Sequence, residues 1–135
     1  MKTCVFCNIS KSEIISEAKY CYVLLDKYPV AKGHLLVITK KHYESLMEIP
    51  DKELCEIIKT VKQLEKKMVG KLGAKGIDLK HHYRPFLKEG KLVKRHVHFH
   101  LIPRSYEDLV YKSQGKAKRV TLSEKEKQEL VKTLR

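Results

Sequence analysis

The sequence predicts an α+β domain built on an antiparallel β-sheet, with one long helix across the sheet and a short C-terminal helix. Strand-like segments, then a single long helical pattern at residues 51–72, then further strand-like segments follow one another along the chain, and this order is typical of such a domain. With 135 residues, 42% hydrophobic and 33% charged, the chain suffices for one hydrophobic core but not for two comfortable domains.

The first predicted strands lie before the long helix. Residues 13–19 and 20–26 alternate enough to form one or two strands. Residues 34–39, His-Leu-Leu-Val-Ile-Thr, are apolar and rich in β-branched side chains, and the segment is entered through Pro29 and Gly33. This pattern predicts a second core strand.

The long helix is predicted from its periodicity and its end signals. Pro50 precedes its first residue, Asp51, and Gly73 supplies a stop signal. The opposite side is Lys and Glu, so we expect the helix to lie across the sheet with one side in water. Cys55 belongs to the same pattern and is expected to be buried. The apolar positions at helical spacing are Leu54, Ile57, Ile58, Val61, Leu64, Met68 and Leu72.

Two further strands and the last helix are predicted after residue 73. Residues 76–82 are strand-like, and residues 95–104 alternate strictly, with Pro103 expected to end the strand. Ser123-Glu-Lys-Glu126 has the form of a capping box, which predicts a short helix running to Arg135.

The charge balance favours polyanionic partners. Twenty-nine Lys and Arg against 16 Asp and Glu give a net charge of +13, which suits nucleotides, nucleic acid or acidic membrane surfaces. The alternative is a lysine-rich surface that only keeps the chain in solution. No apolar stretch approaches the ~20 residues of a membrane-spanning helix, and the first residues lack the apolar segment of a secretory signal. We therefore expect a cytoplasmic protein without membrane contact.

The chain has four cysteines, two of them closely spaced. Cys4-Val-Phe-Cys7 is half of a tetrahedral zinc site and needs two more ligands, for which His34, His42 and the region of His96 are available. A redox pair is the alternative, although such pairs follow a strand at a helix start. Cys21 lies in an apolar run and is expected to be buried.

Three histidines alternate near the C-terminal end of the predicted sheet. On a strand, His96, His98 and His100 project from one face, while Val97, Phe99 and Leu101 enter the core. Three imidazoles in a row indicate either a metal site or a cluster that handles an anion, with one ring as nucleophile or base. Joint zinc ligation by all three is disfavoured because alternate residues of a straight strand splay too far apart.

Three blocks of the sequence resemble the histidine triad (HIT) superfamily. Residues 96–102, His-Val-His-Phe-His-Leu-Ile, are similar to its signature, residues 26–42 to its upstream block, and Cys-Val-Phe-Cys to its zinc-containing branch. The resemblance implies a HIT domain over residues 4–104, with residues 105–135, including a linker-like stretch at 112–119, as an extension of the same domain. It also implies a homodimer and a small-molecule nucleotide substrate.

The resemblance further implies nucleotidyl transfer or hydrolysis at a nucleoside α-phosphate. By position, His98 would be the nucleophile of a nucleotidyl-histidine intermediate, with His96 and His100 flanking the phosphate. Asp26 would hold the ribose hydroxyls and His34 would support the triad. One ring can both attack and depart, because a neutral imidazole is nucleophilic and a phosphate-bound histidine cation is a good leaving group.

The same resemblance implies a zinc site on Cys4, Cys7, His42 and His96. Four protein ligands leave no open coordination position, so this metal would be structural and would hold the N-terminal segment against the triad strand.

One region departs from the family pattern. Many members have Gly-Gln-Ser-Val or similar before the triad, where this chain has Lys-Leu-Val-Lys-Arg at residues 91–95, and residues 82–85 replace the usual upstream Asn. This stretch belongs to the basic segment 80–95, for which a solvated hairpin is the default reading. Charge for the leaving group is the alternative, from Lys91, Lys94, Arg95 or Arg104.

Two functions from different classes remain. The first is a hydrolase or transferase that releases a nucleoside monophosphate from dinucleoside polyphosphates such as Ap4A or from nucleoside phosphoramidates, the basic surface favouring polyphosphates. The second is a nucleotide- or nucleic-acid-binding module with weak or lost catalysis. Nucleic acid is the less favoured partner, because His98 and Asp26, to which the resemblance assigns catalysis and the ribose, are both present.

Overall fold

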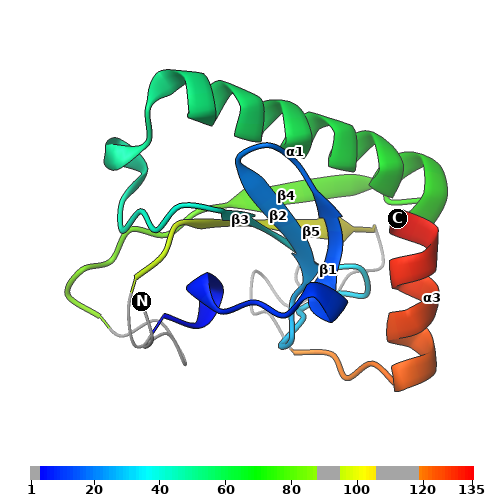
Figure 1. Cartoon of the computed structure of the whole chain (residues 1–135). Coiled ribbons are helices and arrows are strands. Elements are labelled where there is room, and N and C mark those ends of the chain that lie inside the picture. Colours follow the sequence, from blue (N-terminus) through cyan, green and yellow to red (C-terminus); the bar gives the residue numbers. More distant parts are fainter. Residues whose placement is uncertain (1–3, 88–94, 106–118) are drawn as a thin grey trace.

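Five antiparallel strands in the order β1-β2-β3-β5-β4 form one sheet in the computed structural model, which describes residues 4–87, 95–105 and 119–135. Figure 1 shows α1 along one face of this sheet and the N-terminal segment on the other. The strands are β1 (Ile14–Glu17), β2 (Cys21–Leu25), β3 (Leu35–Thr39), β4 (Gly76–Lys80) and β5 (His98–Arg104); the helices are α1 (Asp51–Leu72) and α3 (Glu124–Leu134), with short 3-10 turns η1 (Val5–Cys7), η2 (Lys11–Glu13) and η3 (Leu46–Glu48). The predicted fold class is confirmed.

The predicted strands of the first half are all present, each slightly shorter than expected. β2 pairs with β3 along its whole length, from Cys21 opposite Thr39 to Leu25 opposite Leu35. Every residue of β3 is buried, because α1 covers one face of this strand and the N-terminal segment packs on the other. The apolar run at 34–39 therefore marks the centre of the sheet, and Cys21 is buried as predicted.

Helix α1 begins and ends where the sequence predicts. Gly73 ends it in the left-handed conformation (φ 68°), which glycine adopts without steric cost. The side chains that face the sheet are Ile57, Val61, Leu64 and Met68. The prediction was wrong for Ile58, which is 43% exposed, and for Cys55, which is exposed. These two lie three positions apart, outside the arc that contacts the sheet.

Strand β5 begins later than the predicted 95–104 but ends at the predicted residue, Arg104. It begins at His98, because the backbone of Val97 is taken up by a bond from its N–H to the carbonyl of Tyr43 (2.8 Å). Pro103 lies inside the strand rather than ending it. The pairing of β3 with β5 stops at Leu101. Proline is tolerated at position 103 because β3 offers no carbonyl there that would need a backbone N–H from β5. Val97, Phe99 and Leu101 are buried in the core as predicted.

The C-terminal helix α3 packs against α1 and closes one end of the sheet (Figure 1). The predicted capping box is present: the Ser123 side chain accepts from the Glu126 N–H, and the Glu126 side chain accepts from the Ser123 N–H. Leu130 and Leu134 are buried, and Leu134 belongs to the main core. Within the described part of the chain, no helix combines the length and apolar character that a membrane crossing requires.

The basic segment is only partly described. Lys91 and Lys94, like the linker-like stretch up to residue 118, lie outside the described residues. Arg104 does not supply charge to a ligand: it is buried, and its Nε donates to the Asp78 carboxylate (2.9 Å). Arg95 donates to two backbone carbonyls, those of Arg84 and Leu87.

Candidate active site and metal centre

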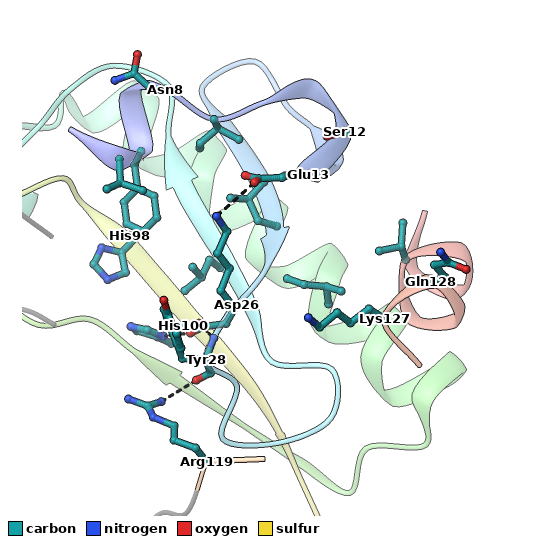
Figure 2. A pocket seen from close by; sticks show the side chains of 18 of the residues that line it. Asn8, Ser12, Glu13, Asp26, Tyr28, His98, His100, Arg119, Lys127 and Gln128 are labelled. Carbon is teal, nitrogen blue, oxygen red and sulfur yellow. Dashed lines mark hydrogen bonds and ion pairs between the residues drawn. The ribbon is translucent and has the colours of Figure 1, made fainter. Parts of the chain in front are cut away.

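A cavity of about 1050 Å³ lies on the sheet face turned away from α1. Figure 2 shows Asp26, His98 and His100 facing it from the sheet, with Lys127 and Gln128 of α3 on its far side. One part of its wall is apolar and consists of Val5, Phe6, Ile9, Leu24, Leu25 and Leu36. An apolar wall beside convergent polar groups is the usual build of a small-molecule site.

His98 is held by the backbone of its own strand. Its Nδ1 donates to the carbonyl of His96 (2.8 Å), so in the neutral ring the lone pair lies on Nε2. The Phe6 ring packs edge-on against it at a centroid distance of 5.0 Å, and the His100 ring lies at the same distance. The imidazole is therefore fixed in both tautomer and orientation.

His100 is positioned by a chain of hydrogen bonds that starts at a backbone amide. The Val30 N–H donates to Nδ1 of His34 (3.1 Å), so the proton of a neutral His34 ring is on Nε2, which donates to Nδ1 of His100 (2.9 Å). The proton of a neutral His100 is then on its own Nε2. The Asp26 carboxylate lies beside both rings, its Oδ2 at 3.2 Å from His34 Nε2 and 3.6 Å from His100 Nδ1.

Burial and neighbouring groups set the protonation states of His34 and Asp26. Burial of His34, which is 2% exposed, lowers its pKa from 6.5 to about 4, although Asp26 opposes the shift. His34 is thus neutral at pH 7 and acts as a hydrogen-bond relay. Burial alone would raise the pKa of Asp26, but the His100 imidazole and the Tyr28 N–H lower it overall, so the carboxylate is ionised.

A second cluster lies at the other end of the triad segment. The ligand atoms of Cys4, Cys7, His42 and His96 all lie within 4.8 Å of one another. Nδ1 of His96 is 3.2 Å from the Cys4 Sγ and 3.5 Å from the Cys7 Sγ, and Nδ1 of His42 is 3.3 Å from the Cys7 Sγ. Cys4 directly precedes η1 and Cys7 is its last residue, and the histidines come from the segments after β3 and before β5.

These four side chains fit a zinc ion in number and type. The Nε2–H of His96 donates to the Thr39 carbonyl (2.7 Å), so the Nδ1 lone pair points toward the thiols. Histidine ligands of metals are commonly oriented in this way, by a hydrogen bond from the ring nitrogen that does not bind the metal. Burial, with the adjacent Cys4, raises the pKa of the Cys7 thiol; a divalent cation would reverse this, because it binds the thiolate.

The sequence-predicted residues thus fall into two groups. Asp26, His98 and His100 line the cavity, and His34 lies directly behind His100. His96 does not line the cavity: it is 2% exposed and its two nitrogens face Thr39 and the cysteines. The place of His96 beside a phosphate stays a prediction, and the described residues do not bring the three triad histidines together as joint metal ligands.

Several residues of the cavity were not predicted. Phe6 and Ile9 reach it because η1 folds over the sheet, and the first of them lies inside the Cys-Val-Phe-Cys motif that was interpreted only as a metal site. His82 and Arg84 come from the stretch that departs from the family pattern. The wall formed by α3 had no signal in the sequence, since the position of that helix depends on its packing against α1.

The family model of the HIT domain matches residues 8–107. The chain belongs to the HIT domain family. An uncharacterised HIT-like protein of Methanocaldococcus jannaschii is 39% identical over 90% of this chain and 94% of its own length. The adenosine 5'-monophosphoramidase of Saccharomyces cerevisiae is 42% identical over 75% of this chain, and the match spans 62% of the yeast protein. Relatives with enzyme names agree with the prediction that this chain is an enzyme.

The fold agrees with solved HIT structures. A hypothetical histidine triad nucleotide-binding protein from Sulfolobus tokodaii superposes with a TM-score of 0.76 at 29% identity, covering 97% of this chain and 89% of that one. The HIT resemblance and the predicted architecture are both confirmed by these matches.

Proposed function

We propose that this HIT protein cleaves nucleotides at the α-phosphate through a nucleotidyl-histidine intermediate on His98. The observation that supports this most strongly is the hydrogen bond from His98 Nδ1 to the His96 carbonyl (2.8 Å). In the neutral ring it places the lone pair on Nε2, which is the form a nucleophilic histidine needs.

The reaction takes place in two displacements. Nε2 of His98 attacks the α-phosphorus, an N–P bond forms, and the bond from phosphorus to the leaving group breaks; an amine leaving group takes the proton that it needs from solvent. Water then attacks the same phosphorus and returns one proton to solvent, and the N–P bond breaks to release the nucleoside monophosphate and a neutral imidazole. The Nε2–H of His100 donates to a non-bridging phosphoryl oxygen; one such donor contributes about 3–4 kcal/mol.

The cavity supports a nucleotide bound in one orientation. The apolar wall around Phe6, Ile9 and Leu36 accommodates a nucleobase, and the ionised Asp26 lies in the same cavity beside His34 and His100. A carboxylate accepts hydrogen bonds from two hydroxyls, so we assign Asp26 to the ribose, with His34 as the residue that orients His100.

Related enzymes indicate nucleotides that carry a leaving group on the α-phosphate. The yeast relative and a Candida albicans relative at 38% identity are named adenosine 5'-monophosphoramidases, and an Arabidopsis thaliana relative at 28% identity is named an adenylylsulfatase. We therefore propose nucleoside phosphoramidates, adenylyl sulfate and dinucleoside polyphosphates such as Ap4A as the substrate classes, which differ in the leaving group.

We also propose that Cys4, Cys7, His42 and His96 bind a structural zinc ion. When bound, the metal contributes a fixed tetrahedral link between η1 and the triad segment; it has no open position for substrate. A homodimer is proposed from the family resemblance, and β4 supports it as a described edge strand that leaves Leu79 46% exposed.

The test is release of nucleoside monophosphate from adenosine 5'-phosphoramidate, AMP-lysine and Ap4A by the wild type, His98→Ala and the control His81→Asn. His81 is the one described histidine outside the cavity and both clusters. We expect loss of activity by about 10⁴-fold or more in His98→Ala and near wild-type activity in the control. No release by the wild type would favour the nucleotide-binding module, and equal release by His98→Ala would exclude His98 as nucleophile.

A further inference from the structure

The segment after β4 forms one edge of the cavity next to the histidines. His82, Arg84 and Leu87 line the cavity, and the His82 ring centroid is 5.9 Å from that of His100, which is itself 5.0 Å from His98. His82 and Arg84 occupy the stretch where the sequence departs from the family pattern, so these side chains are a property of this chain.

Arg95, directly before the triad, holds this segment in place. The Arg95 guanidinium donates to the carbonyls of Arg84 (2.6 Å) and Leu87 (2.8 Å), and the Leu87 N–H closes a turn on the Arg84 carbonyl (3.0 Å). Arg95 is the residue directly before His96. The basic residue that was expected either to be solvated or to bind substrate instead fixes the backbone that presents Arg84 to the cavity.

Arg84 differs in its pairing from two lysines elsewhere around the cavity. Lys27 pairs with Glu13 (3.3 Å) and Lys127 with Glu124 (3.5 Å), so each of these two has a carboxylate partner. No ion pair or side-chain hydrogen bond joins the Arg84 guanidinium to another residue in the described ranges. Among the described residues, the Arg84 guanidinium at the edge of the cavity therefore has no carboxylate partner, and it can pair with an anionic ligand.

We propose that His82 and Arg84 form a leaving-group subsite that selects substrates whose leaving group is an oxyanion, such as sulfate or phosphate, over ammonia or an amine. The proposal rests on the proposed function, since it assumes cleavage at the α-phosphate beside His98. A guanidinium binds a tetrahedral oxyanion through two parallel N–H bonds, whereas it repels a protonated amine. Arg84 would thus contact the leaving group in place of the Gln and Ser that many family members have before the triad.

The experiment compares kcat/KM for adenylyl sulfate and adenosine 5'-phosphoramidate, which share the nucleotide and differ in the leaving group. Enzymes are the wild type, Arg84→Gln, Arg84→Lys, His82→Ala and the control Lys62→Gln, an exposed lysine of α1. We expect the wild type to prefer adenylyl sulfate. Arg84→Gln should lower kcat/KM for it by about 10- to 100-fold and change that for the phosphoramidate by less than about twofold.

The remaining variants sharpen the assignment. Arg84→Lys keeps the charge without the two-pronged geometry and should lie between wild type and Arg84→Gln, and His82→Ala should shift the preference in the same direction by less. Equal losses on both substrates, an unchanged preference, or a wild type that cleaves only the phosphoramidate would overturn the proposal. A wild type that releases AMP from neither substrate would overturn the proposed function, and this subsite with it.

Discussion

Two clusters of histidines lie on the same face of the sheet and resemble each other at first sight. One joins Cys4, Cys7, His42 and His96, the other Asp26, His34 and His100, and within each cluster the potential ligand atoms lie within 4.8 Å of one another. The two clusters differ in where the histidine N–H groups donate. His96 donates away from its cluster, to the Thr39 carbonyl, whereas His34 donates inside its own cluster, to His100.

This difference shows why proximity alone does not identify a metal site. A ring that gives its proton to a backbone carbonyl outside the cluster turns a lone pair toward the centre, and with two thiols there the donors suit zinc. In the other cluster the N–H of His34 is used to orient His100, so the group positions an imidazole at the cavity. The first cluster is also connected to the cavity, because the carbonyl of His96 accepts the Nδ1–H of His98, which lines the cavity.

The largest expected effect is loss of the proposed metal. Cys4→Ala should remove about one zinc per chain and lower the melting temperature by about 10 °C or more, because a structural zinc contributes several kcal/mol to folding. Elemental analysis and thermal unfolding measure both. Cys55→Ala is the matched control, since Cys55 is exposed on α1. Equal zinc in wild type and Cys4→Ala, or none in a wild type expressed with zinc, would contradict the assignment.

The second effect is a loss of stability in acid that belongs to the cavity cluster. His34 has a pKa of about 4 in the folded chain against 6.5 unfolded, so the folded state binds fewer protons between these values. Its contribution is complete above about pH 6.5 and is lost as the pH falls toward 4, about 3 kcal/mol in all. The lowered pKa of Asp26 acts in the same direction.

Urea unfolding at pH 7.5 and pH 4.5 measures this acid effect. His34→Gln is the control, because it removes the titrating ring of His34. It leaves Cys4, Cys7, His42 and His96 in place, so any acid sensitivity of that cluster is the same in both proteins. The wild type should lose about 2–3 kcal/mol more than His34→Gln between the two pH values. Parallel losses in the two proteins would show that His34 does not carry the effect.

The third effect tests the hydrogen-bond chain through catalysis. Asp26→Asn removes the charge next to His34 and His100 and weakens the acceptor proposed for the ribose. We expect kcat/KM to fall by about 10- to 100-fold with zinc content unchanged. The matched control is Asp51→Asn in the exposed first turn of α1. Activity within about twofold of wild type would remove Asp26 from the site.

The smallest effect concerns the side chain that touches both regions. Phe6 packs edge-on against His98 (5.0 Å) and His96 (5.9 Å), and such a ring pair contributes about 0.5–1.5 kcal/mol. Phe6→Leu should therefore lower turnover by about 3- to 10-fold while zinc is retained. Phe86→Leu, at an exposed position outside the cavity, should leave turnover unchanged. Loss of zinc in Phe6→Leu would mean that Phe6 acts through the metal site.

Sequence patterns predicted the elements whose formation depends on residues close together in the sequence. The periodicity of α1 and the left-handed residue Gly73 give its bounds, and the Ser123–Glu126 capping box gives the start of α3. The alternation of His98 and His100 with Phe99 predicts which side chains leave the core. In each case neighbouring residues in the sequence are also the residues that interact.

The remaining features depend on contacts between distant segments. Pro103 stays inside β5 because β3 ends beside it, and Arg104 is buried because Asp78 of β4 pairs with it. The Nε2–H of His96 donates to the carbonyl of Thr39, which is 57 positions away in the sequence. No residue pattern near these positions carries that information.

The decisive measurement is intact-mass spectrometry of the protein quenched during turnover of adenosine 5'-phosphoramidate, with peptide mapping of any adduct. The hydrogen bond that leaves the His98 lone pair on Nε2 predicts one nucleoside monophosphate bound covalently per chain, at His98, and no adduct in His98→Ala. Turnover by the wild type without an adduct, or an adduct that persists in His98→Ala, would contradict the assignment of His98 as the nucleophile.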